Sequence, residues 1–169
     1  MSKPSGEYCR KCSHAMSLVV IEEREVQRCA NCGHIEWNPP VPVAVAIIAG
    51  QKPKSIVLVQ RGIEPRKGQW CLPAGFLNTG ESPAAAAARE GKEESNLDIV
   101  VGELPVRIIT PPGRNQNLHF YLALSSSGEM KPGSDALAVG EFTEDELPTI
   151  AFPAHVEVIG QFFQGKFSS

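Results

Sequence analysis

Three glutamates at helical spacing constrain this chain more than any other feature of its sequence. Glu90, Glu93 and Glu94 follow the alanine-rich segment 83–88, and helix positions i, i+3 and i+4 share one face. Neighbouring carboxylates repel one another, so the patch is either a solvated acidic face or a site for hard divalent cations. Oxygen-only ligation suits Mg²⁺ or Mn²⁺, which phosphoryl transfer uses to neutralise phosphate oxygens and to activate water. From the carboxylates alone, both interpretations stay open.

The residues around the glutamates favour the metal site. They follow the pattern Gly-x5-Glu-x7-Arg-Glu-U-x-Glu-Glu-x-Gly-U, in which U is hydrophobic. The matching residues are Gly75, Glu81, Arg89, Glu90, Glu93, Glu94 and Leu97. With these seven fixed positions matched over 23 residues, the chain resembles the Nudix hydrolase family, and the resemblance extends over about residues 41–165.

Two positions depart from the Nudix pattern. Gly91 replaces a hydrophobic residue, and we expect this change to remove packing behind the glutamate-bearing helix. Asn96 replaces a glycine at the end of that helix, where the turn needs a left-handed conformation that asparagine tolerates better than most residues. Neither departure touches a charged position, so the catalytic prediction stands.

The resemblance implies an α/β fold, the Nudix α/β/α sandwich with a mixed sheet, and metal-dependent hydrolysis of a pyrophosphate bond. The catalytic residues that it implies are Glu90, Glu93, Glu94, Arg89 and Glu81. In segment 75–97, which carries the pattern and is called the box, the three helical glutamates would bind Mg²⁺ or Mn²⁺, with the carbonyl of Ala74 as a backbone ligand. Arg89 would pair with Glu81 to orient helix and loop. The family's general base is a box glutamate or an acid on a later loop, where Glu141 and Glu144 are the candidates.

The N-terminal region carries two Cys-x-x-Cys pairs with sixteen residues between them, a spacing typical of a four-cysteine zinc site. Segments 18–21 and 26–28 predict a hairpin that brings the two pairs together. A region of about 40 residues buries too little core to fold unaided, so Zn²⁺ is its expected source of stability. His14 and His34 lie near the pairs and are interpreted as bystanders. The predicted zinc ligands are Cys9, Cys12, Cys29 and Cys32.

Composition and charge exclude several other classes of protein. The chain is 42% hydrophobic and 21% charged, which is typical of a globular protein, and its net charge is -3. Five basic and five acidic residues cancel over residues 1–40, so we expect no nucleic-acid partner. The longest apolar run, 41–49, is too short to span a membrane. Five cysteines without a visible export signal predict a cytoplasmic protein.

The sequence predicts two domains, a zinc ribbon at 1–38 and a Nudix domain at 41–169, joined at Asn38-Pro39-Pro40 because proline stiffens the backbone. Ser82 and Pro83 predict the start of a helix that packs closely on a sheet through its alanines. Cys71 is expected to be a small core residue and not a nucleophile. The expected strands are 43–49, 55–60, 97–101, 105–110, 118–125 and 139–142, and the expected helices are 83–95 and 152–163.

Several residues outside the glutamate-bearing segment are candidates for substrate binding. Arg61, Arg66 and Lys67, on the loop before the box, either contact a diphosphate or are simply solvated. Trp70 either packs under that loop or stacks on a base, with packing preferred. His119 lies on a predicted strand and either faces the ligand or is structural.

A zinc ribbon before a Nudix domain resembles two groups, the NADH pyrophosphatases and ribbon-bearing proteins described as acting on FAD or ADP-ribose. The first group carries a Ser-Gln-Pro-Trp-Pro-Phe-Pro stretch after the box, and this chain has no such stretch. Segment 147–153 and loop 61–70 look more like the second group, so FAD or ADP-ribose is the favoured substrate. NADH, a nucleoside triphosphate and a non-catalytic nucleotide-sensing role remain alternatives, and a homodimer is left open.

Overall fold

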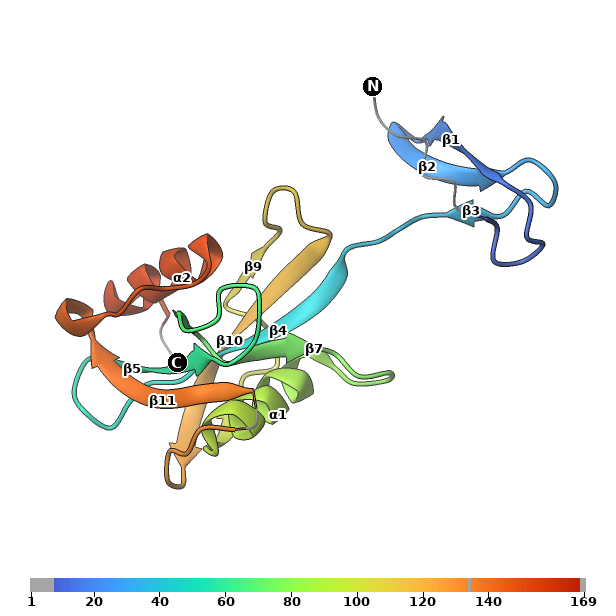
Figure 1. Ribbon diagram of the computed structural model, residues 1–169. Helices are drawn as coiled ribbons and strands as arrows, with labels where there is room; N and C mark the ends of the chain where they lie inside the picture. The colour runs from blue at the N-terminus through green and yellow to red at the C-terminus, as the bar shows by residue number, and fades with distance from the viewer. Residues whose placement is uncertain (1–7, 134, 168–169) are drawn as a thin grey trace. The chain divides into compact units, whose positions relative to one another are not determined.

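The computed structural model describes residues 8–133 and 135–167 of the chain. The chain divides into two compact units, Met1–Pro40 and Val41–Ser169 (Figure 1). No helix among the described residues has the length and the apolar character needed to cross a membrane.

The first unit is a small antiparallel sheet in the order β1-β2-β3. Strand β1 (Met16–Ile21) pairs with β2 (Arg24–Cys29), and β3 (Ile35–Glu36) adds to the other edge of β2. Glu22 and Glu23 reverse the chain with φ angles of 49° and 64°, the left-handed values that a two-residue hairpin turn requires. The predicted hairpin is therefore confirmed.

The second unit has a mixed sheet in the order β7-β4-β10-β8, with β9 also paired to β10, and a second sheet in the order β11-β5-β6. Strands β4 and β10 run parallel, and the other pairs are antiparallel. The strands are β4 (Val41–Ile47), β5 (Ser55–Arg61), β6 (Trp70–Cys71), β7 (Ala74–Phe76), β8 (Asp98–Val101), β9 (Arg107–Ile109), β10 (Gln116–Ser127) and β11 (Ala136–Thr143). The helices are α1 (Pro83–Ser95), the 3-10 turn η1 (Glu144–Glu146) and α2 (Pro153–Phe163).

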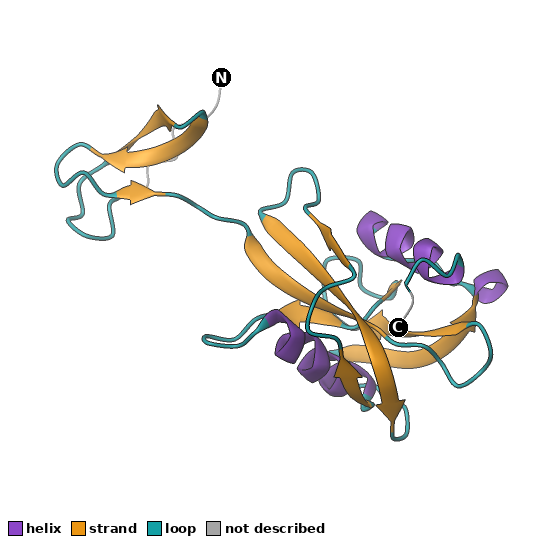
Figure 2. Ribbon diagram, turned by 180° about the vertical axis from the view of Figure 1, so that it is seen from behind, coloured by secondary structure: helices purple, strands orange, loops and turns teal. Residues whose placement is uncertain are grey.

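Strand β4 is the centre of the fold, because its alternate side chains contact different helices. Its odd-numbered residues, such as Val45 and Ile47, pack with α2, and its even-numbered residues, such as Ala44 and Ala46, lie on the side of α1. Helices α1 and α2 thus cover opposite faces of the strands (Figures 1 and 2). The predicted α/β fold, with a mixed sheet between helices, is confirmed.

Helix α1 follows from local sequence signals. The Ser82 side chain accepts a hydrogen bond from the N–H of Ala85 at 3.2 Å, and Pro83 occupies the first turn. Ala86 and Ala87 are fully buried against Ala44 and Tyr121, so the alanine run lets the helix approach the sheet closely, as predicted. The helix has the predicted bounds.

Asn96 ends helix α1 in the left-handed conformation, with φ 63° and ψ 8°. The expected role of this asparagine is confirmed. The expected effect of Gly91 is wrong, because a Cβ at Gly91 would overlap the Cδ1 atom of Ile99. Ile99 and Ile48 fill the space that a hydrophobic residue would occupy in the box, so the glycine removes no packing.

The remaining predictions differ from the structure mainly at strand ends. Strand β9 covers only the middle of predicted segment 105–110, and β11 begins three residues before predicted segment 139–142. The two-residue strand β6 and three-residue strand β7 were not predicted, because such short segments carry no periodicity of their own.

Candidate active site

Arg89 on α1 organises the glutamate-bearing segment. Its Nε and Nη2 donate to the two carboxylate oxygens of Glu81 at 2.8 and 3.0 Å, and Nη2 also donates to the carbonyl of Phe76 at 3.0 Å. Its Nη1 donates to Glu90 at 2.6 Å and to Glu93 at 3.0 Å. Hydrogen bonding from Arg89 holds the pKa of Glu81 below its ordinary value. One guanidinium therefore joins the loop before α1 to two of the three predicted metal ligands.

Two further contacts hold the side chains of Glu90 and Glu94 beside strand β7. The N–H of Ala74 donates to the carboxylate of Glu94 at 3.0 Å. A Cβ at Gly75 would overlap the Glu90 carboxylate, so this position accepts only glycine while Glu90 keeps its place. Burial raises the pKa of Glu94 to about 7, although the Ala74 hydrogen bond opposes the rise, and burial also raises the pKa of Glu90.

The donor set fits a hard divalent cation. It consists of carboxylate oxygens on one helical face, and Glu90 and Glu94 have raised pKa values because burial disfavours their ionised forms more than the hydrogen bonds from Arg89 and Ala74 favour them. The carboxylates of Glu90, Glu93 and Glu94 do not converge on one point in the structure. Among the described residues, only four cysteines form a converging group of metal-binding side chains. Arg89 and the Ala74 N–H hold the glutamates instead. Glu93 is the most exposed of the three, with 58% of its side chain accessible.

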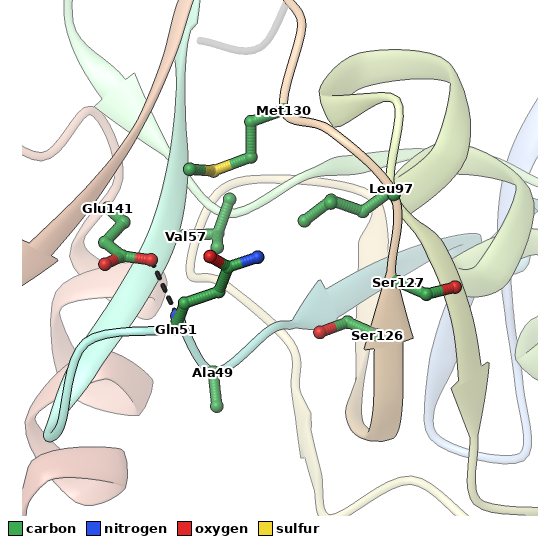
Figure 3. Close-up of a pocket in the computed structure, with 10 residues that line it drawn as sticks. Ala49, Gln51, Val57, Leu97, Ser126, Ser127, Met130 and Glu141 are labelled. Carbon is green, nitrogen blue, oxygen red and sulfur yellow. Dashed lines mark hydrogen bonds between the residues drawn. The ribbon is translucent and has the colours of Figure 1, made fainter.

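The carboxylate of Glu141, a general-base candidate from the sequence, has a structural role in a turn. It accepts hydrogen bonds from the N–H groups of Gln51 and Lys52 at 2.7 and 2.9 Å, which fixes the turn between β4 and β5. Figure 3 shows Glu141 beside a cavity of only about 20 Å³, large enough for roughly one water molecule. Glu144, the other candidate, lies exposed in η1.

Asp135 is an acid of this region that the sequence analysis missed. It lies exposed just before β11, and its negative charge contributes to the raised pKa of Glu94. Its carbonyl accepts a hydrogen bond from the N–H of Gly62 at 2.8 Å, which ties the residue to the end of β5. The signal that could have found it is an acid in the loop between the predicted strands 118–125 and 139–142.

The loop that carries Asp135 is also bonded to the end of α1. The N–H of Lys131 donates to the carbonyl of Ser95 at 3.0 Å, and the N–H of Gly133 donates to that of Glu94 at 3.2 Å. These bonds satisfy carbonyls that a helix end leaves without partners. A Cβ at Gly133 would overlap the backbone carbonyl of Glu93, so only glycine permits this approach.

The structure separates the predicted substrate-binding residues. Arg61 donates through Nε to the carbonyl of Pro65 at 2.8 Å and lies over the Phe152 ring, whereas Arg66 and Lys67 are exposed. Trp70 packs edge-to-face on Phe142, with 4.8 Å between the ring centroids.

Two further sequence predictions concern single residues of the second unit. Cys71 is buried, and burial raises the pKa of its thiol to about 12, which suits a core residue. His119 is half-buried on β10 between Ala44 of β4 and Ile108 of β9.

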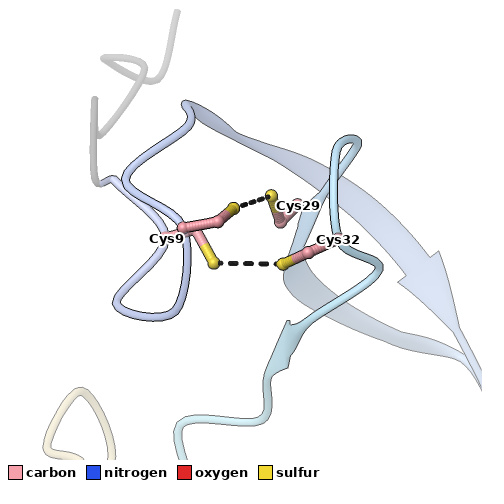
Figure 4. A group of neighbouring side chains, drawn as sticks. Cys9, Cys29 and Cys32 are labelled. Atoms are coloured by element: carbon pink, nitrogen blue, oxygen red, sulfur yellow. Dashed lines mark hydrogen bonds between the residues drawn. The ribbon is translucent and has the colours of Figure 1, made fainter.

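The four cysteines of the first unit converge (Figure 4). All four Sγ atoms lie within 4.8 Å of one another, and the structure records all four as free thiols. The Sγ atoms of Cys9 and Cys32 are 3.5 Å apart, and those of Cys12 and Cys29 are 3.4 Å apart. Zn–S bonds of about 2.3 Å in a tetrahedron give S···S separations of about 3.8 Å, so the cluster suggests a structural zinc site.

The turns that hold the cysteines have matching geometry. The N–H of Cys9 donates to the carbonyl of His14, and the N–H of Cys29 donates to the carbonyl of His34, both at 2.8 Å. A hydrogen bond with the His14 backbone lowers the pKa of Cys12 to about 5, whereas the His34 backbone opposes but does not prevent a rise in the pKa of Cys32 to about 12 through its hydrogen bond with Cys12. Without a metal, the cluster therefore favours the thiolate at Cys12 and the thiol at Cys32. Neither histidine belongs to the converging group, and the interpretation of both as bystanders stays a prediction.

Comparison with known proteins gives a consistent result. The family described as NUDIX domain matches residues 39–162. An ADP-ribose pyrophosphatase of Methanocaldococcus jannaschii is 32% identical over 154 residues, which cover 89% of this chain and 86% of that protein. An NAD-capped RNA hydrolase NudC of Vibrio vulnificus is 30% identical over 73% of this chain, but only 46% of that protein is covered. The crystal structure of a NUDIX hydrolase from Nitrosomonas europaea superposes with a TM-score of 0.81 at 27% identity, covering 95% of this chain and 92% of that one.

Proposed function

The chain belongs to the Nudix hydrolase family, and from that premise we propose that it cuts the diphosphate linkage of an ADP-linked compound, ADP-ribose or FAD, into two monophosphates. As a Nudix pyrophosphatase it acts on nucleoside diphosphate compounds. The complete set of box carboxylates on α1 carries the proposal for the reaction. The Methanocaldococcus jannaschii relative, which matches over most of both chains and is named an ADP-ribose pyrophosphatase, supports the choice of ADP-ribose.

We propose that Glu90, Glu93 and Glu94 hold Mg²⁺ or Mn²⁺, with the carbonyl of Ala74 as a further ligand. Such a cation, when bound, neutralises phosphate oxygens and lowers the pKa of a water molecule. Arg89 holds the proposed site in place through hydrogen bonds to Glu81 and to the Phe76 carbonyl. Neither of these groups is a proposed metal ligand, so both bonds can persist when a cation is bound. When Glu90 and Glu93 turn to a cation, those contacts still keep α1 fixed to the loop.

Among the acids outside the box, Asp135 is the one we propose as general base, ahead of Glu141 and Glu144. Asp135 is exposed, its charge acts on Glu94, and its backbone is fixed to Gly62. Glu141 is already committed to two backbone N–H groups. Replacing Asp135 with Asn should lower kcat strongly at unchanged Mg²⁺ affinity, whereas Glu144→Gln should have little effect.

We propose that the four-cysteine cluster holds one Zn²⁺ with a structural role. The cluster has four sulfur ligands, so no open position remains for a water or a substrate in a tetrahedral site. The zinc would therefore stabilise the first unit and take no part in hydrolysis.

NAD(H) is a second candidate substrate, and the similarity to NudC favours it. The chain spans less than half of that relative's length, and it has no Ser-Gln-Pro-Trp-Pro-Phe-Pro stretch. We therefore rank NAD(H) below ADP-ribose and FAD.

The experiment that tests the function is a substrate panel. ADP-ribose, FAD, NADH, diadenosine polyphosphates and nucleoside triphosphates are incubated with the full chain and Mg²⁺ or Mn²⁺, and released monophosphates are quantified. We expect ADP-ribose or FAD to give a higher kcat/KM than any triphosphate, with AMP as one product. Preference for a triphosphate, with pyrophosphate as product, would contradict the proposal. Nucleotide binding without metal-dependent turnover would indicate a sensor.

A further inference from the structure

Two arginines that are far apart in the sequence contact one aromatic ring. The Cζ atom of Arg61, at the end of β5, lies 5.0 Å from the centroid of the Phe152 ring. The Cζ atom of Arg114, in the loop between β9 and β10, lies 5.5 Å from the same centroid. The separation of the two guanidiniums is therefore no greater than the sum of these distances. A guanidinium that rests on an aromatic ring can present N–H donors at its edge to an anion, although Nε of Arg61 already donates to the carbonyl of Pro65.

No carboxylate forms an ion pair with either arginine among the described residues. Of the six other described arginines, three are neutralised: Arg10 by Glu36, Arg89 by three glutamates, and Arg107 by Glu157. Two cations held on one ring repel each other, and a shared anion would convert that repulsion into attraction. Guanidiniums match the geometry of phosphate oxygens, to which they donate in pairs.

The arginine pair lies beside the strands that lead into the box. The N–H of Arg61 donates to the carbonyl of Gln69 at 2.9 Å, directly before β6, and the neighbouring Gly62 is bonded to Asp135. Strand β6 continues through two residues into β7, whose first residue, Ala74, contacts Glu94. The backbone of Arg61 is thus connected, through β6 and β7, to the segment that contacts the predicted metal ligand Glu94.

The ring that supports the arginines is also held in place. Phe152 precedes α2, and the N–H of its neighbour Ala151 donates to the carbonyl of Trp70 at 2.8 Å. The Phe152 ring contacts the ring of buried His155, with 5.3 Å between centroids. A fixed platform of this kind lowers the entropy lost when a ligand orders the arginine side chains.

We propose that Arg61 and Arg114, supported by Phe152, form an anion-binding site that holds one phosphate of the substrate and retains it in the nucleoside monophosphate product. The inference rests on the proposed diphosphate hydrolysis for the identity of its ligand. The site supplies protein-borne positive charge to a phosphate, in addition to the charge of the cations at the box. It accounts for recognition of a phosphate ester and not of a nucleoside alone.

Binding of AMP and of adenosine to the full chain, without added Mg²⁺ and with the cysteine site left intact, tests the inference by isothermal titration calorimetry. Arg114→Gln should weaken AMP binding at least tenfold and leave any adenosine binding unchanged. Arg114→Lys keeps the charge but loses the flat contact with Phe152, so its loss should be smaller. Arg107→Gln is the matched control: it removes an arginine from neighbouring β9 and should leave AMP binding as in the wild type. Arg114 is exposed, so its replacement leaves the fold intact.

Steady-state kinetics provide the second readout. Arg114→Gln should raise KM for ADP-ribose about as much as it weakens AMP binding, with a smaller change in kcat. Wild-type-like AMP binding by Arg114→Gln would overturn the site, even if the enzyme hydrolyses ADP-ribose. If Arg107→Gln weakened AMP binding as much as Arg114→Gln does, the effect would come from the overall charge of the protein, and the proposed site would also be overturned. An inactive wild type whose AMP binding still depends on Arg114 would refute the proposed function and leave the anion site standing.

Discussion

The N–H of Leu72 donates to Nδ1 of His155 across a buried contact of 3.2 Å, and this bond ties helix α2 to the segment that enters the box. Burial lowers the pKa of His155 to about 3, with a smaller contribution from the charge of Arg61. The histidine is therefore a neutral acceptor in the folded protein.

The first prediction concerns stability at acidic pH. The folded pKa of His155 lies below the unfolded value of about 6.5, so the unfolded chain binds more protons between those values. Stability is fully retained above pH ~6.5 and falls as the pH falls toward 3, and this group alone should cost about 2 kcal/mol between pH 7 and pH 5. Urea unfolding at both values measures the change.

His155→Asn provides the control for that prediction. The amide oxygen of asparagine can replace Nδ1 as the acceptor for Leu72 but does not titrate near neutral pH. The variant should be less stable at pH 7 and should lose less stability between pH 7 and pH 5. An unchanged pH dependence in His155→Asn would rule out His155 as the source.

The second prediction concerns the box carboxylates. Glu93→Gln or Glu94→Gln should reduce turnover by several orders of magnitude at saturating Mg²⁺, because each change removes a proposed charged ligand of a hard cation. The fold should persist, since the amide oxygen introduced by Glu94→Gln can still accept from Ala74 and the loss of carboxylate repulsion favours the helix. Activity assays and far-UV circular dichroism measure both effects. Near-full activity in either variant would make the metal assignment wrong.

The third prediction concerns zinc. Metal analysis of the purified chain should give one zinc per molecule, and X-ray absorption should give four sulfur ligands at about 2.3 Å. Chelation should unfold the first unit, because the metal replaces the core that such a short region lacks. Disulfides among Cys9, Cys12, Cys29 and Cys32, or a metal-free protein that keeps this unit folded, would contradict the assignment.

The fourth prediction concerns the loop between β10 and β11. Gly133→Ala should destabilise the protein by about 1–3 kcal/mol, because the added Cβ overlaps the carbonyl of Glu93 and forces the loop away from α1. Activity should fall with it if Asp135 needs that loop in place. Gly160→Ala, in helix α2 with open space at its Cβ, should instead stabilise by about 0.5–1 kcal/mol. Thermal unfolding of both variants gives the comparison, and equal effects would exclude the clash as the cause.

Features that depend on neighbouring residues were predictable from the sequence. Ser82, Pro83 and Asn96 specify both ends of α1 through capping and a left-handed turn, and the structure has these ends. The cysteine pairs likewise follow from two tight turns and a hairpin between them.

Features that depend on tertiary contacts were not predictable. The space beside Gly91 is filled by Ile99 from the next strand, and no local pattern reports that contact. Phe152 and Arg114 meet only because β5, β10 and α2 converge, so the pair with Arg61 has no signature in the sequence. The charge of Asp135 acts on Glu94 because the loop contacts of Lys131 and Gly133 with the end of α1 bring the two residues near each other.

Because side chains alternate along β4, the two faces of the strand tolerate changes in side-chain volume to different extents. On the side of α1, the strand offers Ala44 and the helix offers Ala86 and Ala87, so any larger residue there must lift helix α1 off the sheet. On the side of α2, Val45 and Ile47 have large partners that can repack around a changed volume. In a library of random variants, enlargement at position 44 should therefore abolish activity before it reduces expression, whereas volume changes at position 45 should affect both together.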